Sequence, residues 1–186
     1  MKKLIIDSST SHIFTLGFED NGTVAAVIHK SNYSRDDLIH QVYCDKMPEI
    51  VYIGKGPGSF TGLRNLFAYF SILNKISKVK VFSLPSLEIW RTALDPNRKF
   101  DQFIITLNRK LGFLQKNQGS YRLIEKNEAV SEALIFDPSG YWDSDPIAIK
   151  IDESIESPWS QLLEQGNPIS FFQPEYGFEL DFLKKG

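Results

Sequence analysis

The order of strand-like and helix-like segments in the first half of the chain restricts the fold more than any other feature. Runs of β-forming residues predict strands at 3–7, 12–18, 23–29, 49–53 and 79–83, and apolar spacing predicts helices at 34–47, 61–76 and 86–94. Asn21 and Gly22 indicate a hairpin between the second and third strands, because both residues tolerate the positive φ of a tight turn. The later strands alternate with helices, which indicates parallel crossovers and a mixed α/β fold.

The second half of the chain repeats this plan in a reduced form. A turn cluster at 95–97 predicts a boundary between an N-terminal lobe, 1–97, and a smaller C-terminal lobe, 98–186. Beyond the turn we expect strands at 103–107, 112–116, 120–125 and 147–151 and helices at 129–135 and 158–165. The repeat is inferred from the order of elements alone.

A glycine-rich turn between a predicted strand and a predicted helix is the most informative stretch. Residues 54–64 read Gly-Lys-Gly-Pro-Gly-Ser-Phe-Thr-Gly-Leu-Arg. Such a turn brings backbone N–H groups together at a helix N-terminus, where an anion can bind. The stretch matches neither the P-loop nor the complete dinucleotide fingerprint. Glycines that let the helix pack close to the sheet are the alternative interpretation.

Nine consecutive residues of this turn, 56–64, resemble the signature of the TsaB (YeaZ) family. The opening stretch 4–10 and the stretch 85–87 are also similar to that family, and 108–112 and 174–176 are weakly so. The resemblance implies the two-lobed ASKHA fold of actin, hexokinase and Hsp70, an RNase H-like fold. Each lobe would hold a mixed five-stranded sheet with helices, the second lobe being reduced.

The same resemblance implies a non-catalytic subunit that binds and activates TsaD, which transfers threonylcarbamoyl to tRNA adenosine. TsaE and tRNA would be reached only through the complex. The chain departs from the family at the start of its first helix. There it reads Tyr33-Ser34-Arg35 in place of His-Ser-Glu, and the helix and the connection after it are shortened. A small phosphotransferase and a homodimeric interaction module stay open as alternatives.

A second implied feature is a phosphate-facing loop after the first strand. In ASKHA ATPases an aspartate there holds the water shell of the metal. Nucleotide could contact residues of this loop and of the glycine-rich turn: Asp7, Ser8, Ser9, Thr10, Gly56, Gly58 and Ser59. The alternative is that Asp7 and Ser8 only stabilise a turn between strands. No cofactor is expected to be required, and weak ATP or ADP binding stays open.

The predicted helix 61–76 carries more apolar surface than one sheet can cover. Leu63, Leu66, Phe67, Phe70 and Leu73 form one face, and further apolar residues continue it round the helix. Either other helices bury the excess, or it is a partner surface. Together with the first predicted helix, the resemblance implies a TsaD interface at Leu38, Val42, Arg64, Ala68, Tyr69, Ile72 and Ile76.

Composition excludes several other functions. The 186 residues carry a net charge of −2 and scattered basic residues, which argues against tight autonomous binding of tRNA. The single cysteine, Cys44, allows no disulfide within the chain. His12, His29 and His40 lack metalloprotease spacing, so no metal site is expected. Apolar runs are too short for a membrane span or a secretory signal, so we expect a cytoplasmic protein.

Overall fold

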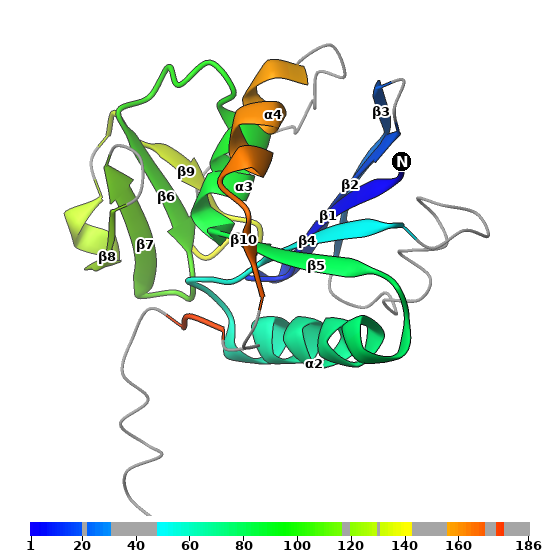
Figure 1. Ribbon diagram of the computed structural model, residues 1–186. Helices are drawn as coiled ribbons and strands as arrows, with labels where there is room; N and C mark the ends of the chain where they lie inside the picture. The colour runs from blue at the N-terminus through cyan, green and yellow to red at the C-terminus, as the bar shows by residue number, and fades with distance from the viewer. Residues whose placement is uncertain are drawn as a thin grey trace, which may run out of the picture.

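A six-stranded mixed sheet forms the larger half of the molecule (Figure 1). The computed structural model describes residues 1–19, 22–30, 48–116, 120–129, 131–142, 156–169 and 174–176. The strands of this sheet, in spatial order, are β10 (Asn167–Pro168), β5 (Lys80–Leu84), β4 (Ile50–Gly54), β1 (Lys3–Asp7), β2 (His12–Glu19) and β3 (Gly22–Lys30). The predicted hairpin is confirmed, since β2 and β3 pair antiparallel from His12 to Glu19.

The centre of this sheet is parallel. β1 pairs parallel with β4, and β4 pairs parallel with β5. Helix α2 (Phe60–Ile76) makes the crossover from β4 to β5. β1 and β4 are apolar and buried along most of their length, which is typical of strands covered on both faces. The carboxyl ends of β1, β4 and β5 therefore meet at one edge of the sheet.

The smaller half is built on a second mixed sheet. Its described strands, in spatial order, are β8 (Tyr121–Glu125), β7 (Leu111–Lys116), β6 (Gln102–Thr106) and β9 (Leu134–Phe136). β6, β7 and β8 form an antiparallel meander, and β9 pairs parallel with β6. A short 3₁₀ helix, η1 (Lys126–Glu128), follows β8.

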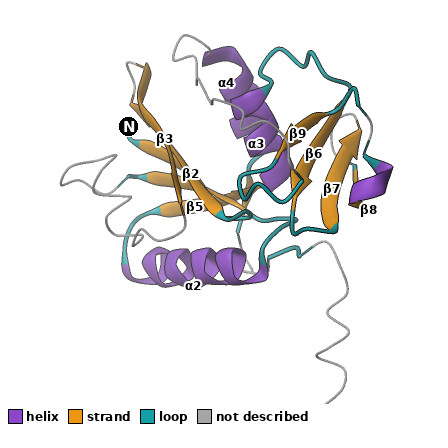
Figure 2. Cartoon of the chain, turned by 180° about the vertical axis from the view of Figure 1, so that it is seen from behind, coloured by secondary structure: helices purple, strands orange, loops and turns teal. Residues whose placement is uncertain are grey.

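Helices separate the two sheets. α2 lies on the outer face of the first sheet, whereas α3 (Ser86–Leu94) and α4 (Glu156–Glu164) lie between the sheets in both views (Figures 1 and 2). Trp90 of α3 is fully buried there, and its ring stacks on Phe136 of the second sheet with centroids 4.6 Å apart. Phe14 of β2 packs on both Trp90 and Trp159. One apolar core thus joins both halves.

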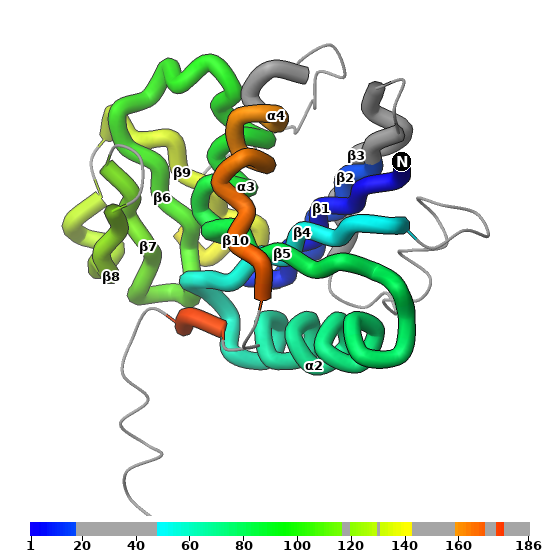
Figure 3. Tube along the Cα trace, viewed as in Figure 1, coloured from blue at the N-terminus to red at the C-terminus, as the bar shows by residue number. Residues whose placement is uncertain are grey.

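The sheets differ from the expected five strands each. The first sheet has six, because the chain returns after α4 and adds β10 to β5; Figure 3 shows this return in orange. The second sheet has four strands among the described residues. The segment that adds β10 lies within the predicted C-terminal lobe but belongs to the first sheet. The predicted helix 34–47 and strand 147–151 lie outside the described residues.

The predicted helix at 129–135 is wrong. Leu134–Phe136 forms strand β9 instead, and the preceding described residues form η1 and turns. A short apolar run fits either a helix or a strand, and periodicity cannot separate them. Here β6 offers an open edge, and Phe136 gains its contact with Trp90 in the core. The predicted helix 158–165 is confirmed as α4.

Candidate functional site

The loop after β1 and the glycine-rich turn after β4 lie against each other. The Ser59 backbone N–H donates to the Ser9 carbonyl oxygen at 2.6 Å, and the Ser8 hydroxyl donates to the Gly62 carbonyl oxygen at 2.8 Å. The seven residues predicted to contact nucleotide therefore come together at the carboxyl ends of parallel strands. In open α/β sheets this edge is where ligands usually bind.

Asp7 lies at the centre of this edge and is fully buried. Its Oδ1 accepts hydrogen bonds from the Ser9 N–H at 2.9 Å, the Ser9 hydroxyl at 2.6 Å and the Trp90 indole N–H at 2.7 Å. Its Oδ2 accepts from the Ser86 hydroxyl at 2.5 Å. Burial raises the pKa of Asp7, and these hydrogen bonds oppose that shift. The carboxylate is thus occupied by donors from its own loop and from α3.

The glycines of the turn permit close contacts that no larger residue allows. A Cβ atom at Gly58 would lie 2.4 Å from the Ser9 Cβ, and one at Gly62 would lie 1.9 Å from the Ser8 carbonyl oxygen. At Gly54 it would lie 1.6 Å from the Asp7 Oδ2. These positions leave no space between the two loops. This supports the packing interpretation of the glycines.

Few polar groups of the two loops point outward. Asp7, Ser8 and Ser9 are buried, and Thr10 is only 8% exposed. The Thr10 hydroxyl both donates to the His12 carbonyl and accepts from the His12 N–H, at 3.0 Å each. Gly56 and Gly58 are buried and Ser59 is half-buried. Nucleotide binding at these residues stays a prediction.

Two residues of this cluster were missed by sequence reasoning. The Ser86 hydroxyl joins the two loops, because it donates to Asp7 and accepts from the Gly56 N–H at 2.9 Å. Trp90 donates to Asp7 from the next turn of α3. Ser86 is the first residue of α3 and follows the end of β5 after Pro85, and that end lies beside the end of β4, so strand order was a signal for its position.

The outer face of α2 presents the predicted partner residues. Ile72 is 59% exposed and Ile76 is 75% exposed, and Arg64 and Ala68 are exposed as well. Tyr69 is half-buried, with its ring edge-on to Phe70. Leu38 and Val42 lie outside the described residues. The opposite face of α2 is buried on the sheet through Leu63, Leu66, Phe67 and Phe70.

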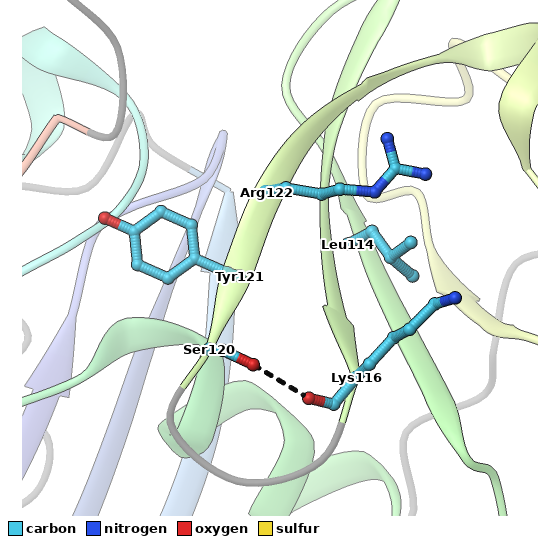
Figure 4. A pocket seen from close by; sticks show the side chains of 5 residues that line it. All are labelled: Leu114, Lys116, Ser120, Tyr121 and Arg122. Atoms are coloured by element: carbon cyan, nitrogen blue, oxygen red, sulfur yellow. Dashed lines mark hydrogen bonds between the residues drawn. The ribbon is translucent and has the colours of Figure 1, made fainter.

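A cavity of about 260 Å³ lies on the second sheet, away from these loops (Figure 4). It is lined by Leu114, Lys116, Ser120, Tyr121 and Arg122. The Ser120 hydroxyl donates to the Lys116 carbonyl oxygen at 3.2 Å, and the Arg122 guanidinium pairs with Glu128 at 2.8 Å. The residues predicted to bind nucleotide do not line this cavity.

The described part of the chain holds neither a candidate metal cluster nor a helix that could span a membrane. Its His, Cys, Asp and Glu side chains include no group of three or more that could hold a metal ion. Its helices include none with both the length and the apolar character to cross a bilayer.

Comparison with solved structures places this arrangement of sheets and helices. A protein with similarity to peptidase YeaZ, from Pseudomonas aeruginosa, matches 95% of this chain and 99% of its own, with a TM-score of 0.61 and 16% identity. YeaZ from Pseudomonas aeruginosa matches 94% of this chain and 100% of its own, with a TM-score of 0.60 and 14% identity. The chain has the YeaZ fold. The two-lobed ASKHA-like α/β fold expected from the sequence is confirmed.

The YeaZ fold is supported by structure rather than by overall sequence similarity. No protein-family model matches the chain, and no curated protein matches its sequence. At 14–16% identity the likeness to YeaZ concerns the fold. The glycine-rich stretch 56–64, which suggested this fold, runs from the turn after β4 into the first residues of α2 and packs on the loop after β1.

Proposed function

We propose that the chain is a TsaB-like, non-catalytic subunit that binds TsaD and activates it for threonylcarbamoyl transfer to tRNA adenosine. The observation that carries this proposal is the exposed apolar surface at Ile72 and Ile76, on the outer face of a helix whose other face is buried in the sheet. Exposed apolar side chains gathered on one helix are typical of protein interfaces. The YeaZ fold and the resemblance of residues 56–64 indicate which partner to test.

In this role the chain acts through position rather than chemistry. The packed loops at Asp7 and Gly58 hold the start of α2 rigidly against the sheet, so α2 can present a fixed surface to TsaD. A rigid surface loses little conformational entropy on binding. TsaD would be held in its active conformation, and tRNA and TsaE would join through the complex.

Copurification with TsaD of the same organism tests the proposal. Replacing Ile72 with Glu puts a charged group into the desolvated contact, and loss of a central interface side chain usually costs more than about 2 kcal/mol, roughly a thirtyfold loss of affinity. The matched control is Asn74→Glu, which introduces the same side chain at an exposed position of α2 outside the predicted interface. Normal binding by Ile72→Glu, or no binding by the unaltered chain, would contradict the proposal.

A homodimeric interaction module is the second candidate, because the same exposed isoleucines could cover each other in two copies of the chain. Sedimentation of the isolated chain with and without TsaD separates the two functions. If the chain is a TsaD partner, it should bind TsaD with higher affinity than it binds a second copy of itself. A homodimer unaffected by TsaD would favour the second candidate.

A further inference from the structure

A short segment near the C-terminus, residues 174–176, crosses the glycine-rich turn. The Glu175 backbone N–H donates to the Lys55 carbonyl oxygen at 2.6 Å. The Lys55 ammonium group in turn lies 2.7 Å from the Glu175 carboxylate. In Figure 1 this segment is the short red piece beside the N-terminal end of α2. We refer to residues 174–176 as the strap.

Gly56 allows the strap to approach the turn closely. Its φ is +111°, a conformation that favours glycine, and a Cβ atom there would lie 1.7 Å from the Glu175 carbonyl oxygen. The strap and the turn therefore touch backbone to backbone. Gly56 thus permits the close approach of the strap, whereas Gly58 and Gly62 permit that of the loop after β1.

The strap also contacts the first turn of α2. The Tyr176 ring packs on the ring of Phe60, the first residue of α2, with centroids 4.7 Å apart. The guanidinium group of Arg64 lies over the same Phe60 ring, 5.9 Å from its centroid. Phe60 therefore contacts both Tyr176 of the strap and Arg64, a residue of the predicted interface.

Phe60 and Arg64 begin a stripe that runs along α2 to the exposed isoleucines. Residues four apart on a helix are neighbours on its surface, although each such step turns about 40° round the helix axis. The stripe at this spacing consists of Phe60, Arg64, Ala68, Ile72 and Ile76. All of its members are exposed except Phe60, which is half-buried against Tyr176. The stripe therefore winds round the outer side of α2 toward the exposed isoleucines, and the strap contacts it at Phe60, next to Arg64.

We propose that the strap positions the N-terminal end of the partner surface, with Tyr176 as the positioning residue. This inference rests on the proposed function, because it assumes that α2 binds the partner. If strap attachment favours partner binding, partner binding must favour strap attachment to the same degree. The strap is then coupled to the interface in both directions.

The test uses the full chain and TsaD of the same organism. Tyr176→Ala removes the ring on Phe60, and we expect TsaD affinity to fall about five- to tenfold, the lower range of coupling between sites. Tyr176→Phe keeps the ring and should restore the affinity. Hydrogen exchange of the Glu175 amide, which bonds to Lys55, should slow when TsaD is added to the unaltered chain.

Three outcomes separate this inference from the proposed function. Normal binding by Ile72→Glu overturns both, since α2 would not be the interface. Failed binding by Ile72→Glu together with normal binding by Tyr176→Ala overturns the positioning role alone. Exchange of the Glu175 amide that TsaD does not change also overturns it, because a merely structural strap would not respond to the partner.

Discussion

The glycine-rich turn and the outer face of α2 are consecutive in the chain but opposite in character. In the turn, Gly58 and Gly62 are so close to the loop after β1 that a single added carbon would overlap it. Sixteen residues beyond Phe60, Ile76 is 75% exposed. The glycine-rich turn has the more distinctive sequence and packs tightly on a neighbouring loop. The outer face of α2 has an ordinary sequence and is exposed. A recognisable sequence motif can therefore be required for packing, while the residues that bind a partner follow it in the chain.

Packing explains why the two regions differ. The turn packs against Asp7 and Ser86 at Gly54 and against the loop after β1 at Gly58 and Gly62, so only glycine fits at these three positions. The outer face of α2 contacts no described strand. Packing within the chain therefore does not restrict which residues stand there. Four predictions test this contrast, from the largest expected effect to the smallest.

The largest effect is expected on the buried face of α2. Phe67 is 4% exposed and packs in the core between α2 and the first sheet. Phe67→Asp should prevent folding, because burying an unpaired charge costs more than about 4 kcal/mol in severe cases. The matched control is Asn65→Asp, which places the same side chain at an exposed position of α2. Circular dichroism and thermal unfolding compare the two, and a folded Phe67→Asp protein would contradict the assigned core.

A smaller effect is expected where the turn meets the loop after β1. Gly62→Ala should destabilise the protein by about 2 kcal/mol, as overpacking of a filled site does, since the new Cβ would lie 1.9 Å from the Ser8 carbonyl oxygen. In an open helix the same change stabilises by about 0.5–1 kcal/mol. Urea unfolding gives the sign. Asn74→Ala, at an exposed site on the same helix, should not destabilise, and a stabilising Gly62→Ala would show that the loops are not sealed.

Sequence reasoning predicted the elements whose signals are local. The predicted bounds of β1 and α3 agree with the structure, and β4 and α2 differ by one residue at their ends. β10 could not be predicted, because it consists of two residues and exists only through its pairing with β5. A strand that depends on a distant partner leaves little trace in its own residues.

The site was predicted only in part for the same reason. The resemblance named Asp7 and the glycines of the turn, which do lie together. It gave no site role to Ser86, although 85–87 carry part of the resemblance, nor to Trp90; these residues reach Asp7 from 79 and 83 residues away in the chain. Nor did the weak resemblance at 174–176 assign a contact to Glu175, whose ion pair with Lys55 spans 120 residues. Side-chain partners at such separations follow from the packed fold rather than from sequence spacing.

Because Asp7 is buried beside the two packed loops, we also expect the stability of the protein to depend on pH. Because burial raises the pKa of Asp7 above its ordinary value, the folded chain binds this proton more tightly than the unfolded chain. The stabilising contribution of the proton is complete below the unfolded pKa and is lost as pH rises through the folded pKa. The stability of the unaltered chain relative to Asp7→Asn should therefore be greatest in acid and should fall with rising pH.

Urea unfolding of both proteins at several pH values between about pH 5 and pH 8, the range in which protein stability is usually greatest, measures this difference. Asn74→Ala serves as a control, because it removes no titrating group. A difference that does not change with pH, or that grows as pH rises, would indicate that solvent or charged groups reach Asp7. The turn and the outer face of α2 would then differ less than the structure indicates.

The smallest effect is expected at the exposed end of α2. Ile72→Glu and Ile76→Lys should each change the free energy of unfolding by no more than about 0.5 kcal/mol, as exposed substitutions usually do. Glu at position 72 would lie three residues before Lys75, a favourable spacing for an ion pair, and Lys at position 76 suits the negative end of the helix dipole. Thermal unfolding of the isolated chain provides the measurement. A loss of more than about 2 kcal/mol in either variant, the size typical of core substitutions, would place that isoleucine in a contact within the chain, and the partner surface would then have to lie elsewhere on α2.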